Sequence, residues 1–193
     1  RVSENRLKGR VCRLLVTPLI NSLKMVLGPH QYLDYLASFR YPLAGEFSMQ
    51  ADVLRDIRIP SDWGLEIGTL SEVYRHYSTR HLCQVDTAGI YDHKHQKLSP
   101  DDASRGLNKM STDITKAIIR KLATQGQIFS QGTFRTIKAS YYRTALDFVE
   151  TYYNDAMING LDFDRHEEEE AVELFLGSVV KAGEQFLSNP LEA

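Results

Sequence analysis

The sequence predicts an α/β fold with few strands, followed by an all-helical C-terminal part of about three helices. The strand prediction rests on His81–Val85, the best strand candidate in the chain, which ends at Asp86. The helical prediction rests on apolar residues that recur at helical spacing through three segments after Ser99. We therefore divide the chain into residues 1–98 and residues 99–193, and expect the second part to pack on the first.

Composition places the chain among ordinary globular proteins. Of its 193 residues, 42% are hydrophobic and 25% are charged, and a chain of this length buries roughly 70% of its unfolded surface. The net charge of −2 gives no positive field for nucleic acid, and no apolar run approaches the ~20 residues that cross a membrane. Two cysteines make no disulfide framework, so we expect a reducing, cytoplasmic compartment.

One long helix and two short helical segments are predicted before residue 60. Residues 1–8 are polar and basic, and we expect them to be poorly ordered. Apolar residues recur from Val11 to Val26, which predicts a helix that Gly28 ends and that Pro18 kinks or interrupts. A short amphipathic helix or turn is predicted at 32–39, and another short helix is predicted to start at 52–55.

Arginine is frequent at the start of this first helix. Gly9 and Arg10 come directly before it, and a helix N-terminus preceded by glycine, with an arginine close by, can hold a phosphate or a carboxylate. The alternative is a solvated basic tail, which is how charge runs usually behave.

An acidic residue, Glu66, stands in an apolar stripe. Ser61 and Asp62 follow Pro60 and are good N-caps, so a helix is predicted to begin near Asp62 or Trp63. Burial penalises the carboxylate by several kcal/mol, whereas the helix N-terminus favours it by only about 0.3–1 kcal/mol. A neighbour, a wet cleft or a ligand must compensate, and a satisfied structural Glu is the alternative to a binding site. At helical spacing the stripe also holds Leu70, Val73, Tyr74 and Tyr77.

The loop after the strand candidate gathers metal-ligand side chains. His93 and His95 are two residues apart and face the same way in an extended backbone, and Asp86 and Asp92 precede them. Imidazole and carboxylate together bind Zn²⁺, Mn²⁺ or a similar ion. Surface loops also hold such pairs by chance, so the pattern is weak by itself.

Three helices are predicted in the C-terminal part. The first starts at Ser99 and stops at Gly126, the second runs over 133–159, and the third starts at Asp164. Four glutamates at 167–170 are interpreted as a first turn that complements the helix dipole. The inward faces are predicted to carry apolar and aromatic residues, among them Ile114, Ile118, Ile137, Tyr141, Tyr152 and Phe175.

Three stretches become informative when they are taken together. They are Gly9-Arg10-Val11-Cys12-Arg13 with Pro18-Leu19, Pro42-Leu43-Ala44-Gly45-Glu46-Phe47, and Trp63-Gly64-Leu65-Glu66-Ile67-Gly68. The loop from Gln84 to His95 continues the pattern in order and spacing. Over roughly residues 9–125 the chain resembles the glucosyl-3-phosphoglycerate synthase group of glycosyltransferases. The helices after Gly126 look like an extension found in part of this group.

The resemblance implies a GT-A fold (nucleotide-diphospho-sugar transferase) and a retaining transfer of glucose from a nucleotide sugar to 3-phosphoglycerate. It also implies a divalent metal, Mg²⁺ or Mn²⁺, with His93 as a ligand. The implied catalytic residues are Glu66, which contacts the donor sugar, and Leu43, whose backbone lies beside the reacting centre. The implied donor-binding residues are Gly45, Glu46 and Glu66, and the implied acceptor-binding residues are Gly9, Arg10, Cys12 and His95.

The chain departs from the family pattern at three positions and in one larger respect. Cys12 stands where Thr is expected, His95 where Asn is expected and Tyr91 where Arg is expected, and each change alters a polar contact. In addition, the nucleotide-binding half that precedes these motifs in the family, and ends in Asp-x-Asp, has no counterpart in this sequence. We therefore expect the chain to be an incomplete and inactive part of a longer enzyme.

Three other functions stay open on the sequence alone. The first is a related glycosyltransferase with another sugar or acceptor, such as a mannosyl transferase. The second is a non-catalytic helical module for oligomerisation, for instance as a homodimer, which predicts a large self-complementary apolar face on the last three helices. The third is a metal-dependent hydrolase, which requires three or more ligands within about 2.0–2.2 Å of one ion. Its ligands would be Asp86, Asp92, His93 and His95.

Overall fold

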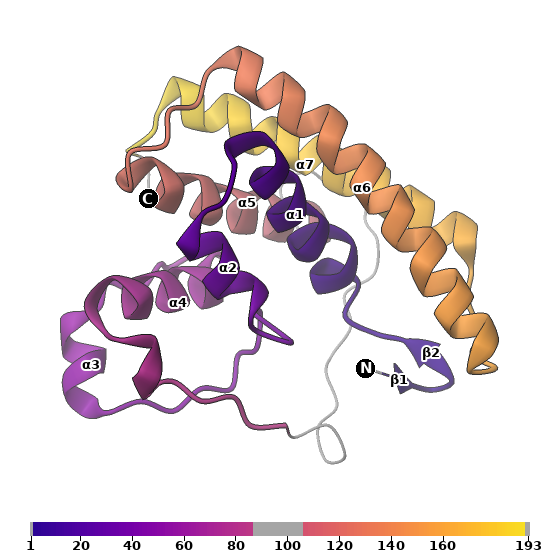
Figure 1. Cartoon of the computed structure of the whole chain (residues 1–193), viewed down its shortest axis with the longest axis horizontal. Helices are drawn as coiled ribbons and strands as arrows, with labels where there is room; N and C mark the ends of the chain where they lie inside the picture. Colours follow the sequence, from indigo (N-terminus) through magenta and orange to yellow (C-terminus); the bar gives the residue numbers. More distant parts are fainter. Residues whose placement is uncertain (1, 87–105, 192–193) are drawn as a thin grey trace.

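The computed structural model describes residues 2–86 and 106–191, and these residues are mostly helical (Figure 1). The strands in the described part form one antiparallel pair, β1 (Val2–Ser3) and β2 (Arg6–Leu7). Few strands and a helical C-terminal part were predicted, and both are confirmed. The described residues show no alternation of strands and helices.

Three long helices follow residue 105, as predicted, although the start expected at Ser99 lies outside the described residues. Gly126 and Gly160, just beyond the ends of the first two, have φ of +91° and +65°, a conformation that glycine adopts without strain. The helical elements are the π-helical turn η1 (Val11–Val16), α1 (Thr17–Leu27), α2 (Gln31–Ala37), α3 (Ala51–Asp56), α4 (Leu65–His76), the 3-10 turn η2 (Thr79–His81), α5 (Gly106–Thr124), α6 (Gln131–Ile158) and α7 (Arg165–Ser188).

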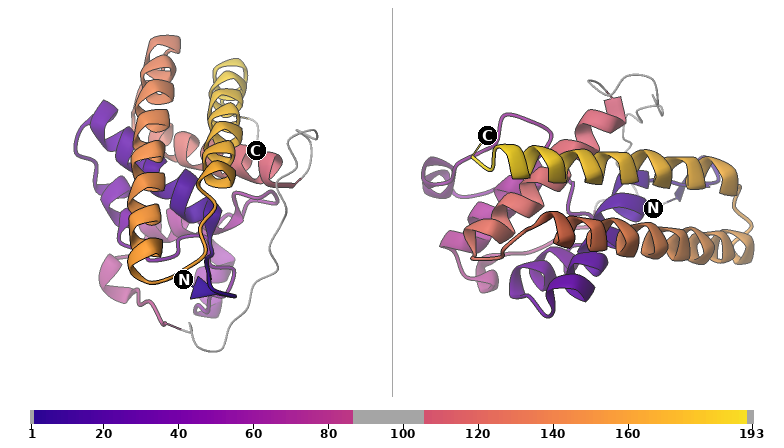
Figure 2. Two further views of the ribbon diagram at one scale, coloured as in Figure 1. Left: turned by 90° about the vertical axis from the view of Figure 1, so that its right-hand side faces the viewer. Right: turned by 90° about the horizontal axis from the view of Figure 1, so that it is seen from above.

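Helices from both parts of the chain share one hydrophobic core. α6 and α7 run antiparallel beside each other, α1 packs on α6, and α5 packs on α7 (Figures 1 and 2). α2 packs on α1 and α4, and α4 packs on α5. Tyr32, Tyr141 and Phe175 are among the largest fully buried side chains. The domain division at residues 98 and 99 stays a prediction, because it falls outside the described residues.

The first helix is interrupted at Pro18, as predicted. Residues 11–16 form the π-helical turn, and the regular helix α1 follows it. Pro18 has no N–H and cannot donate to the carbonyl of Leu14, as residue 18 would in an α-helix. The buried hydroxyl of Tyr141 donates to this carbonyl instead, at 2.7 Å. An α6 side chain therefore satisfies the backbone where the proline disrupts it.

The prediction that residues 1–8 are poorly ordered is wrong for the described residues 2–8. Glu4 and Asn5 have φ of 52° and 57°, and they make the tight turn between β1 and β2. The backbone N–H of Asp162 donates to the carbonyl of Asn5 at 2.9 Å. The hairpin is thus attached to the link between α6 and α7. The polar composition of residues 1–8 does not reveal this long-range contact.

The strand predicted at His81–Val85 is also wrong. The segment ends η2 and continues as irregular chain. The side chain of Gln84 makes the contacts that a neighbouring strand would otherwise make, since its Oε1 accepts the N–H of Arg40 and its Nε2 donates to the carbonyl of Ser38. A strand needs a partner backbone, and the described residues supply a side-chain amide there instead.

Tyr141→Phe tests the link between α6 and the interrupted helix. The variant leaves the Leu14 carbonyl buried without its donor, so the free energy of unfolding is expected to fall by about 1–3 kcal/mol. Urea denaturation measures the change. Tyr142→Phe, at an exposed position on the same helix, is the control and is expected to lose less than about 0.5 kcal/mol. Equal losses in the two variants would contradict the account.

Candidate functional site

Glu66 lies in the first turn of α4, which begins at Leu65 with Gly64 as its N-cap. Asp62 builds the preceding turn, because its side chain accepts the N–H of Gly64 at 2.8 Å. Glu66 is half-buried. In the stripe predicted to hold it, Val73 is buried, and Leu70 and Tyr74 are half-buried against the core. The buried residues of α4 are Ile67, Thr69, Ser71 and Val73.

The surroundings of Glu66 favour its neutral form. Burial raises the pKa of its carboxyl and the negative charge of Glu46 raises it further, whereas a hydrogen bond from its own backbone lowers it. Gly45 lies against the same carboxyl, since a Cβ atom at Gly45 would be 3.9 Å from Oε1 of Glu66. The structure thus brings together the three residues predicted to bind the donor.

Cys12 and Leu43 border the same region. Burial raises the pKa of the Cys12 thiol to about 12, although hydrogen bonds with the Leu43 backbone and the Tyr41 side chain lower it, and the charge of Glu66 acts to raise it. A thiol with this pKa is neutral at physiological pH, so it is a weak hydrogen-bonding group and not a nucleophile. Cys83 is exposed, and the two cysteines are free.

Gly9 completes this region at the ring of Tyr41. Its φ is +78°, and a Cβ atom would lie 3.1 Å from Cε2 of Tyr41, so a larger residue would strain the backbone and displace the ring. Most of the predicted site residues are therefore neighbours. We call them, with the tyrosine that joins them, the Glu66 group: Gly9, Cys12, Tyr41, Leu43, Gly45, Glu46 and Glu66.

Arg10, predicted to bind the acceptor, is held by α7. Its Nη2 lies 3.0 Å from Oε1 of Glu167, and its Nε donates to Oε1 of Glu168 at 2.9 Å. Asp164 caps α7, as predicted, by accepting the N–H of Glu167. The interpretation of these glutamates as dipole complements missed the arginine. Arg10 and Glu168 are 158 positions apart, and no local spacing indicates such a pair.

The predicted metal ligand His93 and the predicted acceptor residue His95 lie outside the described residues, as does Asp92. Asp86 is described, and its Oδ2 lies 3.5 Å from Nη1 of Arg40. Within residues 2–86 and 106–191, no three His, Cys, Asp or Glu side chains are grouped so that they could hold a metal ion. The metal site therefore stays a prediction. None of the described helices has the length and apolarity needed to span a membrane.

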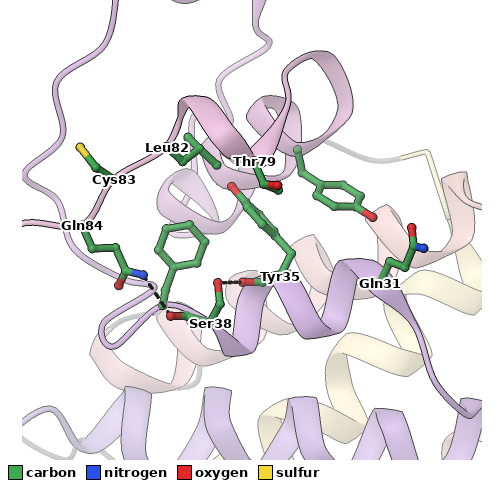
Figure 3. A pocket seen from close by; sticks show the side chains of 9 residues that line it. Gln31, Tyr35, Ser38, Thr79, Leu82, Cys83 and Gln84 are labelled. Carbon is green, nitrogen blue, oxygen red and sulfur yellow. Dashed lines mark hydrogen bonds between the residues drawn. The ribbon is translucent and has the colours of Figure 1, made fainter.

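A cavity of about 450 Å³ lies between α2, α4 and the segment that begins at η2 (Figure 3). Tyr35, Phe39, Tyr74 and Leu82 provide its apolar wall, and none of the predicted site residues that the structure describes lines it. Sequence reasoning missed this cavity because its walls meet only when α2 and α4 pack together. The aromatic residues were a visible signal, but they are also what a plain core contains.

Glu66→Gln tests the surroundings of Glu66 through the pH dependence of stability. Because folding raises this pKa above its ordinary value of 4.5, ionisation of Glu66 works against folding as the pH rises through that value. The neutral amide avoids this cost. The variant is expected to melt above the wild type at pH 7, with the difference vanishing below about pH 4, where both states hold the proton. Thermal unfolding across this range is the measurement. A variant less stable than the wild type at pH 7 would contradict the account.

Comparison with curated proteins finds relatives of one kind. A "Glucosyl-3-phosphoglycerate synthase" of Persephonella marina is 45% identical over 187 residues, which are 97% of this chain and 46% of that protein. One of Methanococcoides burtonii is 44% identical over 184 residues, 94% of this chain and 45% of that protein. One of Petrotoga mobilis is 24% identical over 120 residues, 62% of this chain and 32% of that protein. No protein-family model matches, and no solved structure matches.

The chain spans about half the length of the first two curated relatives, and it is covered by them almost completely. The resemblance seen in the sequence motifs is therefore confirmed as a partial match: nearly the whole chain is similar to about half of each of two glucosyl-3-phosphoglycerate synthases.

Proposed function

We propose that the chain is part of a retaining glycosyltransferase that moves glucose from a nucleotide sugar to 3-phosphoglycerate. The observation that carries this proposal is the identity of 45% and 44% with two glucosyl-3-phosphoglycerate synthases over nearly the whole chain. The Glu66 group supports it, because the residues that the resemblance assigns to the donor are neighbours in the structure.

The proposal includes a GT-A fold. In it, residues 1–98 form the acceptor side and residues 99–193 form a helical extension packed on it. The described residues are compatible with a part of such a domain, since they hold helices and a sheet of two strands. The portion of the relatives that the chain does not match would supply the nucleotide-binding half, so transfer requires more than these 193 residues.

The role proposed for Glu66 follows from charge. Breaking the bond between a sugar and a diphosphate leaves positive charge at the anomeric carbon, and nearby carboxylates or carbonyls stabilise that charge. The carboxylate of Glu66 and the backbone carbonyl of Leu43 are the groups proposed to act there. Because the fold partly removes Glu66 from water, its ionised form gains from a bound, positively polarised sugar. Glu66 positions the donor and need not carry a proton.

A divalent metal, Mg²⁺ or Mn²⁺, belongs to the proposal. When bound, it stabilises the leaving diphosphate as a Lewis acid, and the resemblance assigns His93 to hold it. His93 lies outside the described residues, so the roles proposed for the other residues do not depend on its position.

The acceptor in the proposal is a small acid that carries a phosphate. Arg10 stands at the N-terminus of η1, where a guanidinium and the end of a helix favour an anion. Holding the phosphate there would keep the acceptor hydroxyl close to the anomeric carbon. Gly9, the neutral thiol of Cys12 and His95 complete the proposed acceptor site.

Glu66→Gln in the natural full-length protein tests the proposed role of Glu66. Turnover is expected to fall by at least about tenfold, because the charge that complements the donor sugar is lost. Release of nucleoside diphosphate is measured, with circular dichroism as the check of the fold. Glu72→Gln, a half-buried glutamate on the same helix, is the matched control and is expected to stay within about twofold of wild type. Wild-type turnover in Glu66→Gln would remove Glu66 from the site.

Transfer assays with a panel of substrates test the wider proposal. The 193-residue chain alone is expected to transfer no sugar, and the full-length protein is expected to prefer glucose nucleotides and 3-phosphoglycerate. The panel contains uridine and guanosine diphosphate sugars, both glucose and mannose, and several phosphorylated acids. Transfer by the chain alone would contradict the proposal of an incomplete enzyme. Preference for mannose would favour a related transferase, and no transfer with any pair would favour a helical oligomerisation module.

A further inference from the structure

Glu168 is a buried carboxylate that lies between two arginines. Its side chain is 7% exposed; Oε1 accepts from Nε of Arg10 at 2.9 Å, and Oε2 lies 2.8 Å from Nη1 of Arg13. The second contact is an ion pair without hydrogen-bond geometry, so it is held by charge. Glu168 comes from the first turn of α7, whereas both arginines come from the start of the first helix.

Arg13 is buried and contacts other groups of the protein. It is 9% exposed, its Nε donates to the carbonyl of Lys8, and its Nη2 donates to the carbonyl of Leu7. Its guanidinium carbon lies 4.8 Å from the centre of the Tyr152 ring, which is a favourable cation–π distance. No side of this arginine is left for a ligand, and its role is to support the carboxylate of Glu168.

Arg10 is held on one edge only. Its side chain is 25% exposed, Nε pairs with Glu168, and Nη2 pairs with Glu167, whose side chain is 40% exposed. Nη1 takes part in neither pair. The guanidinium is planar, so a partner fixed on the Nε edge fixes the direction of the whole fork. Of the two arginines on Glu168, Arg10 is thus the one that can meet an anion from solvent.

We propose that Glu168 is a positioning residue for acceptor binding: from α7, it sets the orientation in which Arg10 meets the phosphorylated acid. This inference rests on the proposed function, which assigns Arg10 to the acceptor. It gives the helical extension a role in the site, because the extension supplies the carboxylate that the first helix lacks.

The two glutamates that contact Arg10 differ in what they can do. An ion pair as exposed as that with Glu167 contributes little, since solvent screens it. A buried carboxylate has lost its hydration, and it stays ionised only where cations face it in a fixed geometry. Glu168 therefore constrains Arg10 more strongly than Glu167 does, and the constraint is geometric. Residues that support a binding group in this way are needed for its alignment.

Calorimetric binding of 3-phosphoglycerate to the natural full-length protein tests the inference. Arg10→Ala is expected to weaken binding at least about tenfold, and Glu168→Gln about fivefold. The double variant should bind as Arg10→Ala does, within about twofold, because Glu168 acts only through Arg10. If Glu168 merely stabilised the fold, Glu168→Gln would weaken binding by the same factor in the Arg10→Ala background as in the wild type.

Two further variants separate orientation from charge and from folding. Glu170→Gln, in the same helical turn and paired with His166 alone among the described residues, is the matched control and should bind within about twofold of wild type. Arg10→Lys keeps the positive charge at a partly exposed position but loses the planar fork of the guanidinium, so it should bind about as weakly as Arg10→Ala. This variant tests the orientation of Arg10 even if Glu168→Gln does not fold.

Several outcomes would overturn the inference. They are unchanged binding in Glu168→Gln, additive effects in the double variant, wild-type binding in Arg10→Lys, and no binding by the wild-type protein. Glucose transfer measured on the same preparations keeps the two proposals apart. Acceptor binding that depends on Glu168 without any transfer would contradict the proposed function and support this inference. Glucose transfer that is unchanged in Glu168→Gln would support the proposed function and contradict this inference.

Discussion

The ion cluster of Glu168 with Arg10 and Arg13 joins the two ends of the chain. A buried carboxylate is costly unless cations face it, so the first turn of α7 and the start of the first helix must meet in one arrangement. The Tyr141 hydroxyl, on the Leu14 carbonyl, fixes the same helix from α6. The segment that carries Gly9, Arg10 and Cys12 is therefore held by the C-terminal helices.

Charges of opposite sign lie near this segment. The Glu66 group holds two carboxylates, the half-buried Glu66 and the exposed Glu46, and their repulsion suits a partner of positive character. Arg10, within the segment, offers part of a guanidinium to an anion. The neutral thiol of Cys12 lies between the two in sequence and feels the charge of Glu66. A donor sugar that becomes positive and a phosphorylated acceptor would each find the complementary charge.

Much of the helical structure could be predicted from the sequence, because caps and breakers act locally. Pro18 stands where the first helix changes, Gly28 where it ends and Asp164 where the last helix begins. The members of the Glu66 group other than Tyr41 were identified by resemblance to a family, and helical periodicity placed Glu66, which is half-buried, in an apolar stripe. The pairing of Glu168 with Arg10 could not be predicted, since it joins distant residues. The strand expected at 81–85 failed for the same reason, because its neighbour decides whether a strand forms.

The most direct measurement is a crystal structure of the full-length protein with 3-phosphoglycerate bound. The account predicts that the phosphate or carboxylate of the ligand lies within about 3 Å of the Arg10 guanidinium, while Nε of Arg10 remains on Glu168 and α7 remains packed on η1. A ligand bound away from Arg10, or an Arg10 that leaves Glu168 in order to reach the ligand, would contradict the claim that α7 orients the acceptor site.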